Sequence, residues 1–393
     1  MTAGTSLPGL LWRNAARWPT RPAWRWKRLG IWQTFSWAEF AGWTGALALG
    51  LAARGFGPGE RLAVLGDNRP DLYAALLAAQ TLGGAGVPLD PDAMPATLAA
   101  MLRDADVAVV VVDSAERAER LRALAAALPR MPRIIVADPA GLGRTAAEQQ
   151  PSLAGLAAAG RAIGGDRPDP PVAALARVAP GDTALLLYPG ASRAGARPAV
   201  LTHARLLSAA AAIDAADPVS PTDRALCYLP MHACDDAVYS LALGLLGGFS
   251  CNCPESPASV PRDLREIGPT ILFASPAACV ALADLVQSKA VGASPFKRRV
   301  VGFFLRQALR AEALRAQGSQ VPPGLNLGCR IGEVVACGPA RDQLGLGRIR
   351  WMHAGAPAPA DAGHLLRALG VALRPGDAEI DVAAAQQGEA LHA

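Results

Sequence analysis

Two side chains in the run LPMHACDD have the chemistry of a proton-transfer pair. These are His232 and Asp236, and imidazole and carboxyl groups are the usual general acids and bases of enzymes. Their spacing alone does not distinguish catalysis from a place in the wall of a pocket. We prefer a role in the wall of a pocket or in the structure of the protein.

The candidate nucleophiles and metal ligands lack the neighbours that their chemistry needs. Ser192 has no nucleophile elbow around it, and Ser275 has no adjacent glycine, so a hydrolase triad is not supported. Cys251 and Cys253 have no second ligand pair at metal-binding spacing, so a zinc site is not expected. The sequence also contains neither the phosphate-loop NTPase motif nor the Rossmann glycine fingerprint.

The composition describes a large globular protein. The chain has 393 residues, of which 51% are hydrophobic and 18% are charged. This length and this hydrophobic content are sufficient to form more than one buried core. The net charge of +5 comes from scattered arginines rather than runs, which favours a solvated surface over nucleic-acid binding. Seven cysteines, an odd number, indicate no disulfide framework.

The sequence gives no sign of export or of a membrane span. Its first residues lack a basic start, an apolar core and a cleavage site, so we expect a cytoplasmic protein. Residues 72–89 and 237–253 are apolar, but glycines interrupt them, which favours buried helices. Residues 12–27 are basic and rich in tryptophan. We expect a helix and a hairpin that pack these rings on the domain, although peripheral membrane contact stays open.

Short apolar strands alternate with helices along the chain, which is typical of α/β folds with buried, largely parallel sheets. Ser36 is the expected cap of a helix over residues 38–51, and another helix begins near Asp71. Residues 297–317 form a long basic helix, and residues 137–180 an irregular connection. We expect one subdomain over residues 1–180 and another over residues 181–393. The predicted strands are residues 61–65, 86–89, 107–113, 183–188, 224–229, 270–274, 334–337 and 349–353.

Several of these stretches match one family in order and spacing. They include TFSWAEF, PGERLAV and NRPD in the first half, and RDLREIGPTILFASPAACVAL and GRIRWMHAGAPAPADAGHLLRALG in the second. The chain resembles the AMP-dependent synthetase/ligase family, and within it the adenylate-forming, long-chain acyl-CoA synthetases. The resemblance covers nearly the whole chain and implies the N-terminal domain of these enzymes, with two stacked α/β subdomains.

The resemblance implies a reaction in two steps. A fatty acid carboxylate attacks the α-phosphate of ATP and releases pyrophosphate, and the thiol of CoA then captures the acyl-adenylate. ATP, Mg²⁺ and CoA are therefore the expected cofactors and co-substrates, and the expected ligands are small acyl and nucleotide molecules. Chemistry of this kind depends on positioning and on charge stabilisation.

The resemblance places the phosphate-binding loop at residues 188–203, YPGASRAGARPAVLTH. The family's loop is rich in Thr, Ser and Gly and ends in Pro-Lys-Gly, so that hydroxyl and backbone N–H groups face the phosphates. Here the matching nucleotide-binding candidates are Ser192, Arg193, Arg197 and Thr202. Arg197 stands at the lysine position, and the two arginines could hold phosphate. A plain solvent loop is the preferred interpretation.

Two later segments match other contacts of the family. Gly355, Ala356 and Pro357 follow the strand that contacts adenine. The run DAEID matches a motif of tyrosine, glycine, threonine and glutamate, with Asp377 at the nucleotide-binding end. Asp381 stands at the position of the glutamate that holds Mg²⁺, although its side chain is shorter. We prefer a solvated acidic turn for this run.

The resemblance also implies an acyl pocket at the carboxyl ends of the strands. Its candidate residues are His203, His232 and Asp236. The pocket is expected between residues 201–203, 228–236 and 355–357.

Because few residues follow the DAEID run, we expect the family's lid domain with its catalytic lysine to be absent. The preferred hypothesis is therefore a catalytically impaired member, a pseudoenzyme that keeps a ligand pocket. An active fatty-acid adenylating ligase that uses Arg193, Arg197 and Asp381, with a lid from another chain, is the second hypothesis. A non-catalytic interaction protein is the third.

Overall fold

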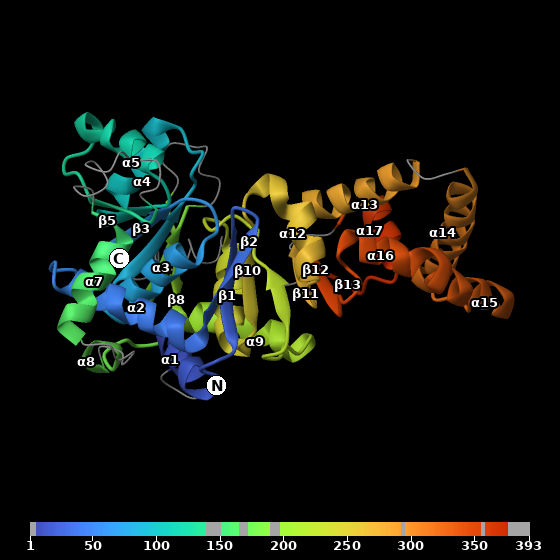
Figure 1. Cartoon of the computed structure of the whole chain (residues 1–393), viewed down its shortest axis with the longest axis horizontal. Helices are drawn as coiled ribbons and strands as arrows, with labels where there is room; N and C mark the ends of the chain where they lie inside the picture. The colour runs from blue at the N-terminus through green and yellow to red at the C-terminus, as the bar shows by residue number, and fades with distance from the viewer. Residues whose placement is uncertain are drawn as a thin grey trace. The chain divides into compact units, whose positions relative to one another are not determined.

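The computed structural model describes residues 5–138, 151–164, 172–188, 197–291, 295–354 and 358–375 (Figure 1). These residues fold into two compact units. The first unit comprises the described residues up to Pro221 together with Pro230–Cys253. The second comprises Thr222–Leu229 and the described residues from Pro254 onward.

The first unit is built on a six-stranded sheet. All its pairs are parallel except that of the two last strands, which are antiparallel. In spatial order the strands are β6 (Arg133–Val136), β5 (Val107–Val112), β3 (Arg61–Leu65), β4 (Ala85–Leu89), β7 (Thr183–Leu187) and β8 (Ala199–Thr202).

Both faces of this sheet are buried, as the β-branched run of β5 predicts. On one face α3 packs on β3 and β4, and Leu76 of α3 fills the space above Gly86. On the other face Ala63 and Leu65 share a core with α4 and α5. The helices of this unit are α1 (Leu7–Arg17), α2 (Trp37–Ala52), α3 (Pro70–Thr81), α4 (Pro95–Asp104), α5 (Ala115–Arg122), η1 (Ala125–Ala127), α7 (Leu153–Gly164), α8 (Val172–Leu175), α9 (His203–Ala216), α10 (Cys234–Asp236), η2 (Ala237–Ala242) and α11 (Leu243–Gly247).

Helices α2 and α7 approach closely because each has a glycine at the contact. A Cβ added to Gly160 would lie 1.8 Å from the carbonyl oxygen of Ala46. One added to Gly50 would lie 2.2 Å from that of Leu156. No side chain fits at either position. This contact corrects our prediction of an irregular connection over residues 137–180, because small residues with weak periodicity form α7 by packing on α2.

The basic, tryptophan-rich start of the chain forms a helix and a hairpin, as predicted. Strand β1 (Pro22–Arg28) pairs antiparallel with β2 (Ile31–Ser36) and parallel with β10 (Ser250–Cys253). Trp24 is 2% exposed and stacks on Tyr73, with ring centroids 4.3 Å apart. Ser36 and Glu39 form a capping box at the start of α2, which confirms the predicted cap.

The second unit contains four parallel strands. They are β9 (Arg224–Leu226), β11 (Ile271–Ala274), β12 (Trp351–Ala354) and β13 (Leu373–Pro375). Asp223 lies before β9 and is 4% exposed at its side chain, where Arg350 binds it at 2.6 Å. The helices are η3 (Pro257–Ser259), α12 (Val260–Ile267), α13 (Pro276–Val291), α14 (Pro295–Ala316), α15 (Pro323–Gly332), η4 (Glu333–Cys337), α16 (Gly338–Leu344) and α17 (Ala360–Ala368).

The predicted α/β class with largely parallel sheets is confirmed. The expected boundary after residue 180 lies within the first unit, because β7 pairs with β4. The strand predicted over residues 334–337 is wrong. Those residues form the π-helical turn η4 between α15 and α16, and the helices on either side override the β preference of two valines.

The two apolar stretches that are long enough to suggest membrane spans divide into shorter elements. Residues 72–89 contribute to α3 and β4, and residues 237–253 to η2, α11 and β10. Within the described ranges, none of the helices combines the length and the apolar character needed to cross a membrane.

Candidate functional site

The carboxyl group of Asp236 is the centre of a buried polar cluster in the first unit. The hydroxyl of Tyr73 lies 2.8 Å from both carboxyl oxygens and donates to them. Asn68 Nδ2 lies 3.3 Å from Asp236 Oδ1 and 2.9 Å from the Tyr73 hydroxyl. Burial raises the pKa of Asp236 to about 7, against hydrogen bonds from Ser240, Tyr73 and Asn68 that lower it. The group therefore exchanges a proton near neutral pH.

Three elements bring this cluster together. Asp236 ends α10 directly before the π-helical turn η2, a kind of turn that occurs often at functional sites. Tyr73 is on α3, and Asn68 is in the loop that follows β3. Our sequence analysis identified Asp236 but missed Asn68 and Tyr73. The sequence signal for them is the NRPD motif itself and the tyrosine that follows it in a helix rich in Ala and Leu.

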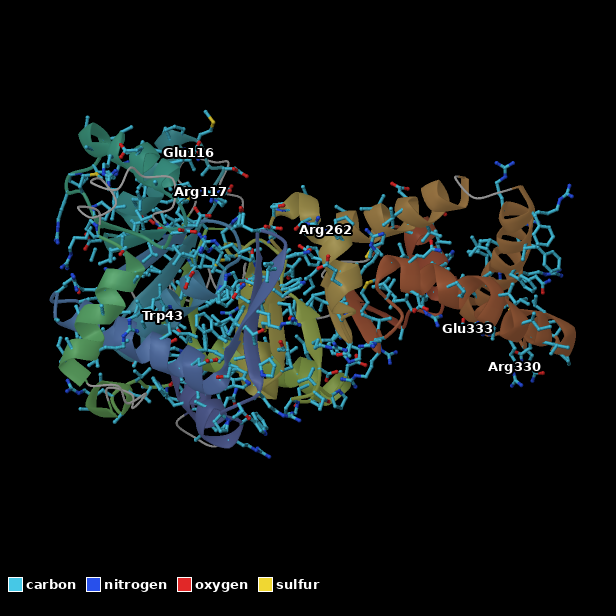
Figure 2. The ribbon with its side chains drawn as sticks, in the orientation of Figure 1. Trp43, Glu116, Arg117, Arg262, Arg330 and Glu333 are labelled. Atoms are coloured by element: carbon cyan, nitrogen blue, oxygen red, sulfur yellow. The ribbon has the colours of Figure 1, made fainter. Side chains whose placement is uncertain are left out.

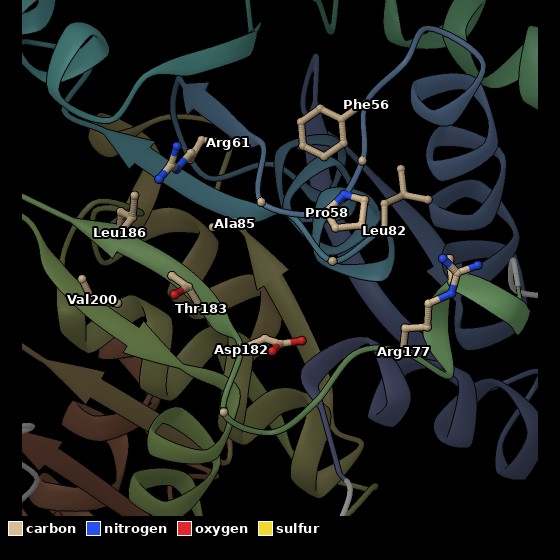
Figure 3. A pocket seen from close by; sticks show the side chains of 15 residues that line it. Phe56, Pro58, Arg61, Leu82, Ala85, Arg177, Asp182, Thr183, Leu186 and Val200 are labelled. Atoms are coloured by element: carbon tan, nitrogen blue, oxygen red, sulfur yellow. The ribbon is translucent and has the colours of Figure 1, made fainter.

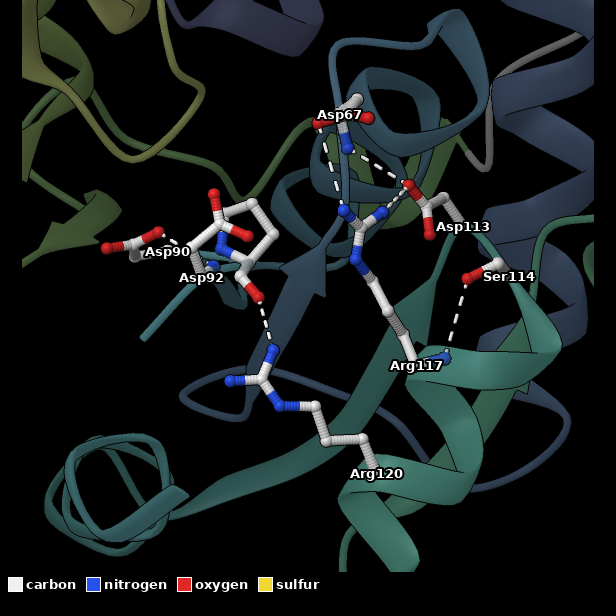
Figure 4. A network of polar contacts seen from close by, with 8 residues as sticks. Asp67, Asp90, Asp92, Asp113, Ser114, Arg117 and Arg120 are labelled. Atoms are coloured by element: carbon white, nitrogen blue, oxygen red, sulfur yellow. Dashed lines mark hydrogen bonds and ion pairs between the residues drawn. The ribbon is translucent and has the colours of Figure 1, made fainter. Parts of the chain in front are cut away.

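A second network fixes the loop after β3 (Figure 4). Asp113 Oδ2, at the end of β5, accepts hydrogen bonds from the Asp67 backbone N–H at 3.0 Å and from Arg117. Arg117 Nη2 also lies 3.8 Å from Asp67 Oδ1. A Cβ at Gly66 would lie 2.6 Å from the Asp113 carboxyl group, so this position requires glycine. The network holds in place the loop that carries Asn68.

His232 lies near a second acidic loop of the same unit. Arg120 donates to two backbone carbonyls of residues 91–93, and the Asp92 N–H donates to Asp90 Oδ1 at 2.9 Å (Figure 4). Burial lowers the pKa of His232, although the charges of Asp90 and Asp92 raise it. Its Nδ1 is buried and has no hydrogen-bond partner among the described residues. A neutral imidazole with one unused nitrogen can bind the polar group of a ligand.

Thr202 and His203 have local structural contacts. Thr202 is the N-cap of α9, and its Oγ1 accepts from the Arg205 backbone N–H at 3.2 Å. His203 is buried, and its Nδ1 accepts from the Leu7 backbone N–H at 3.3 Å. Burial lowers the pKa of His203 to about 4, so its ring is neutral at pH 7. These contacts join α9 to the start of α1, and a role of His203 in an acyl pocket stays a prediction.

The other predicted nucleotide contacts are only partly described. Arg197 lies just before β8, and its side chain is exposed. Ser192, Arg193, Asp377, Asp381 and residues 355–357 lie outside the described residues. The described part of the chain contains no group of three His, Cys, Asp or Glu side chains that could hold a metal ion. Mg²⁺ binding by Asp381 therefore stays a prediction.

A cavity of about 710 Å³ lies in the first unit, at the amino ends of the strands of the six-stranded sheet (Figure 3). Arg61, Ala85 and Thr183, which begin β3, β4 and β7, line it. Phe56 and Leu82 give it an apolar wall. The pocket that the sequence predicts between residues 201–203, 228–236 and 355–357 stays a prediction, because residues 355–357 lie outside the described ranges.

Comparison with known proteins gives the family. The model of the family described as AMP-binding enzyme matches residues 11–374. The chain belongs to this family. Its members are ATP-dependent, adenylate-forming ligases, and acyl-CoA ligases are among the relatives of this chain.

Three individual likenesses are informative. A feruloyl-CoA synthase from Amycolatopsis sp is 29% identical over 63% of this chain and 45% of its own length. An L-proline–[L-prolyl-carrier protein] ligase from Pseudomonas fluorescens is 28% identical over 55% of this chain and 39% of its own. The crystal structure of the anthranilate CoA ligase AuaEII with anthranoyl-AMP matches with a TM-score of 0.68 and 15% identity, over 95% of this chain and 60% of that one.

These comparisons bear on fold and family. The chain spans less than half the length of the two curated relatives. The structural likeness confirms the predicted fold, that of the N-terminal domain of adenylate-forming enzymes. The neighbouring structure holds an acyl-adenylate, a small-molecule ligand.

Proposed function

We propose that this chain is an acid-binding core of the adenylate-forming type whose adenylation activity is impaired. The observation that carries the proposal is a contrast within the sequence. The family match runs through residues 11–374, yet the phosphate-loop segment within it has lost most of the family's hydroxyl and glycine donors. The fold is kept, and the groups that would stabilise the leaving pyrophosphate are altered.

The chemistry of the loop gives this contrast its weight. ATP supplies the α-phosphate that a carboxylate attacks, and the protein must stabilise the charge that develops on the phosphates. Pro189 has no N–H to donate, and Ser192 is the one hydroxyl between residues 189 and 198. Loss of one transition-state donor typically costs about 2.7–4 kcal/mol, or roughly a hundred- to thousandfold in rate. Losses that act on one transition state are not additive, so we expect activity below detection without multiplying them.

The ligand that we propose for this chain is a carboxylic acid. His232 offers an unused buried nitrogen, and Asp236 has a pKa of about 7, so it is not permanently charged. A neutral carboxyl group does not repel the carboxylate of a ligand as an ionised one would. The names of the relatives supply the classes to test, aryl acids such as ferulate and anthranilate and the amino acid proline, besides the fatty acids that the sequence suggests.

The test is ATP–pyrophosphate exchange with Mg²⁺ and saturating ATP across fatty, aryl and amino acids. We expect no exchange above a boiled sample. Exchange that is lost in Arg197→Ala and kept in Arg330→Ala would overturn the proposal in favour of an active ligase that uses loop arginines. Arg330 is a matched control because it is an exposed arginine far along the sequence, on α15 (Figure 2).

Binding is tested separately from catalysis. The same acids, AMP and non-hydrolysable acyl-adenylate analogues are added in thermal unfolding experiments. A ligand at a hundred times its Kd stabilises the folded state by about 2.7 kcal/mol, which is measurable as a rise in Tm. A rise with at least one acid or analogue supports the acid-binding core. No rise with any of them would favour the non-catalytic interaction protein.

A further inference from the structure

Helices α14 and α15 of the second unit expose large apolar side chains. Phe303 is 49% exposed, Leu327 60% and Val334 77%. In the described part of this unit, every exposed large apolar side chain belongs to residues 296–335. The complete set is Phe296, Phe303, Leu327, Ile331, Val334 and Val335.

The two helices follow one another along the chain and pack together as a helical hairpin. A Cβ at Gly328 would lie 2.1 Å from Gln307 Oε1, and one at Gly332 would lie 2.9 Å from Phe304 Cδ1. Gln307 therefore faces Gly328, and Phe304, which comes earlier on α14, faces Gly332, which comes later on α15. The two helices run antiparallel at this contact. Glycines on α15 let the helices pack tightly through these two pairs.

This packing places the exposed apolar side chains on one side of the hairpin. Phe303 precedes a contact position by one residue, and so do Leu327 and Ile331. In two antiparallel right-handed helices, the residues just before the contact positions point to the same side. Phe296 is seven residues before Phe303 and shares its face. We call Phe296, Phe303, Leu327 and Ile331 the apolar ridge.

Arginines border the apolar ridge. Arg299, Arg306 and Arg310 lie four residues before, three after and seven after Phe303, so they follow its face of α14. Arg330 lies next to Ile331 on α15, and all four side chains are exposed. Residues 295–332 contain seven basic residues: Lys297, Arg298, Arg299, Arg306, Arg310, Arg315 and Arg330.

The acidic side chains of this region are paired elsewhere. Glu312, the one acid in residues 295–332, accepts from Arg367 of α17 at 2.8 Å. Glu333, at the start of η4, pairs with Arg341 of α16, with Nη1 and Oε2 3.1 Å apart. The hairpin surface therefore has one sign of charge around an apolar ridge, which is the pattern of helices that lie in a membrane interface.

We propose that the α14–α15 hairpin docks on an anionic phospholipid surface. The apolar ridge enters the boundary between headgroups and acyl chains, and the bordering arginines contact lipid phosphates. Charge selects this occupant over a second copy of the chain, because a second copy would bring the same arginines against one another. The proposal is independent of the proposed function.

The first experiment is flotation of the chain with vesicles. One set is equimolar phosphatidylcholine and phosphatidylglycerol, and the other is phosphatidylcholine alone. We expect binding to the anionic vesicles, at least tenfold weaker binding to the neutral ones, and loss of binding as salt is raised. Absence of binding to the anionic vesicles at low salt would overturn the proposal.

Variants separate the two contributions. Phe303→Ser with Leu327→Ser removes apolar surface from the ridge, and Met94→Ser with Ile163→Ser is the matched control, because these two side chains are 70% and 62% exposed elsewhere. We expect at least tenfold weaker vesicle binding for the ridge variant and none of this loss for the control. All of these side chains are exposed, so folding is expected to be kept, and Tm checks it.

Charge reversal is the second arm. An arginine near an anionic surface contributes roughly fivefold to binding, so reversing Arg299, Arg306 and Arg310 to glutamate is expected to weaken it more than a hundredfold. The control reverses three exposed arginines elsewhere, Arg103, Arg130 and Arg265.

Three results would refute the docking proposal. The first is equal loss of binding in the charge-reversal control, and the second is loss by charge reversal alone with the ridge variant unaffected. The third is a concentration-dependent dimer that Phe303→Ser abolishes, because it would assign the ridge to self-association.

Discussion

The buried carboxyl group of Asp236 makes the stability of the first unit depend on pH. Burial raises its pKa from 3.8 to about 7 in the folded protein. The folded state therefore keeps a proton that the unfolded state loses above pH ~4. Stability linked to this group is greatest below the unfolded pKa, falls as pH rises from about 4 to about 7, and is constant above.

The magnitude follows from the shift. A shift of about three pH units corresponds to ~4 kcal/mol, at 1.36 kcal/mol per unit. Asp236→Asn replaces the carboxyl group by a neutral group of the same shape and removes this term. Its amide faces the amide of Asn68, which adds a cost that does not change with pH. The free energy of unfolding of the wild type relative to the variant should therefore fall by up to ~4 kcal/mol between pH 4 and pH 8.

The assay is urea unfolding of both proteins at several pH values, followed by tryptophan fluorescence. Trp24 reports on the cluster because it stacks on Tyr73, which donates to Asp236. Asp361→Asn, which changes an exposed aspartate of the second unit, is the control. If the difference between wild type and Asp236→Asn is the same at pH 5 and pH 8, the carboxyl group does not carry its proton in the folded state and the reasoning fails.

Two further predictions concern packing and ion pairing. Gly160→Leu should destabilise the first unit by at least the roughly 1–3 kcal/mol of overpacked sites, because its Cβ would lie 1.8 Å from the Ala46 carbonyl oxygen. Gly181→Leu, whose Cβ meets nothing within 4 Å, should leave Tm unchanged, and equal losses in both variants would contradict the α2–α7 contact. Asp223→Ala should destabilise the second unit by roughly 1.5–3 kcal/mol, because Arg350 loses its charged hydrogen bonds at 2.6 and 3.1 Å. Thermal unfolding measures this loss, and an unchanged Tm would mean that the pair is solvated.

Local sequence was sufficient to predict those elements whose structure depends on neighbouring residues along the chain. The β-branched run of β5 makes a strand in any buried sheet, and Ser36 with Glu39 closes a capping box within four residues. The order of such elements, with the motifs between them, gave the α/β class and the family resemblance. These features depend on contacts that the sequence spacing itself fixes.

Tertiary structure alone decided which polar groups meet. Tyr73 and Asp236 are separated by 163 residues, and their hydrogen bond exists because α3 packs beside the segment that ends at η2. Small residues concealed α7 in the same way, because its stability comes from glycine contacts with α2 rather than from its own periodicity. The two valines of η4 were placed in the wrong element, because the helices on either side outweigh a preference of a few tenths of a kcal/mol. Burial and long-range packing set these outcomes, and neither can be read from residue spacing.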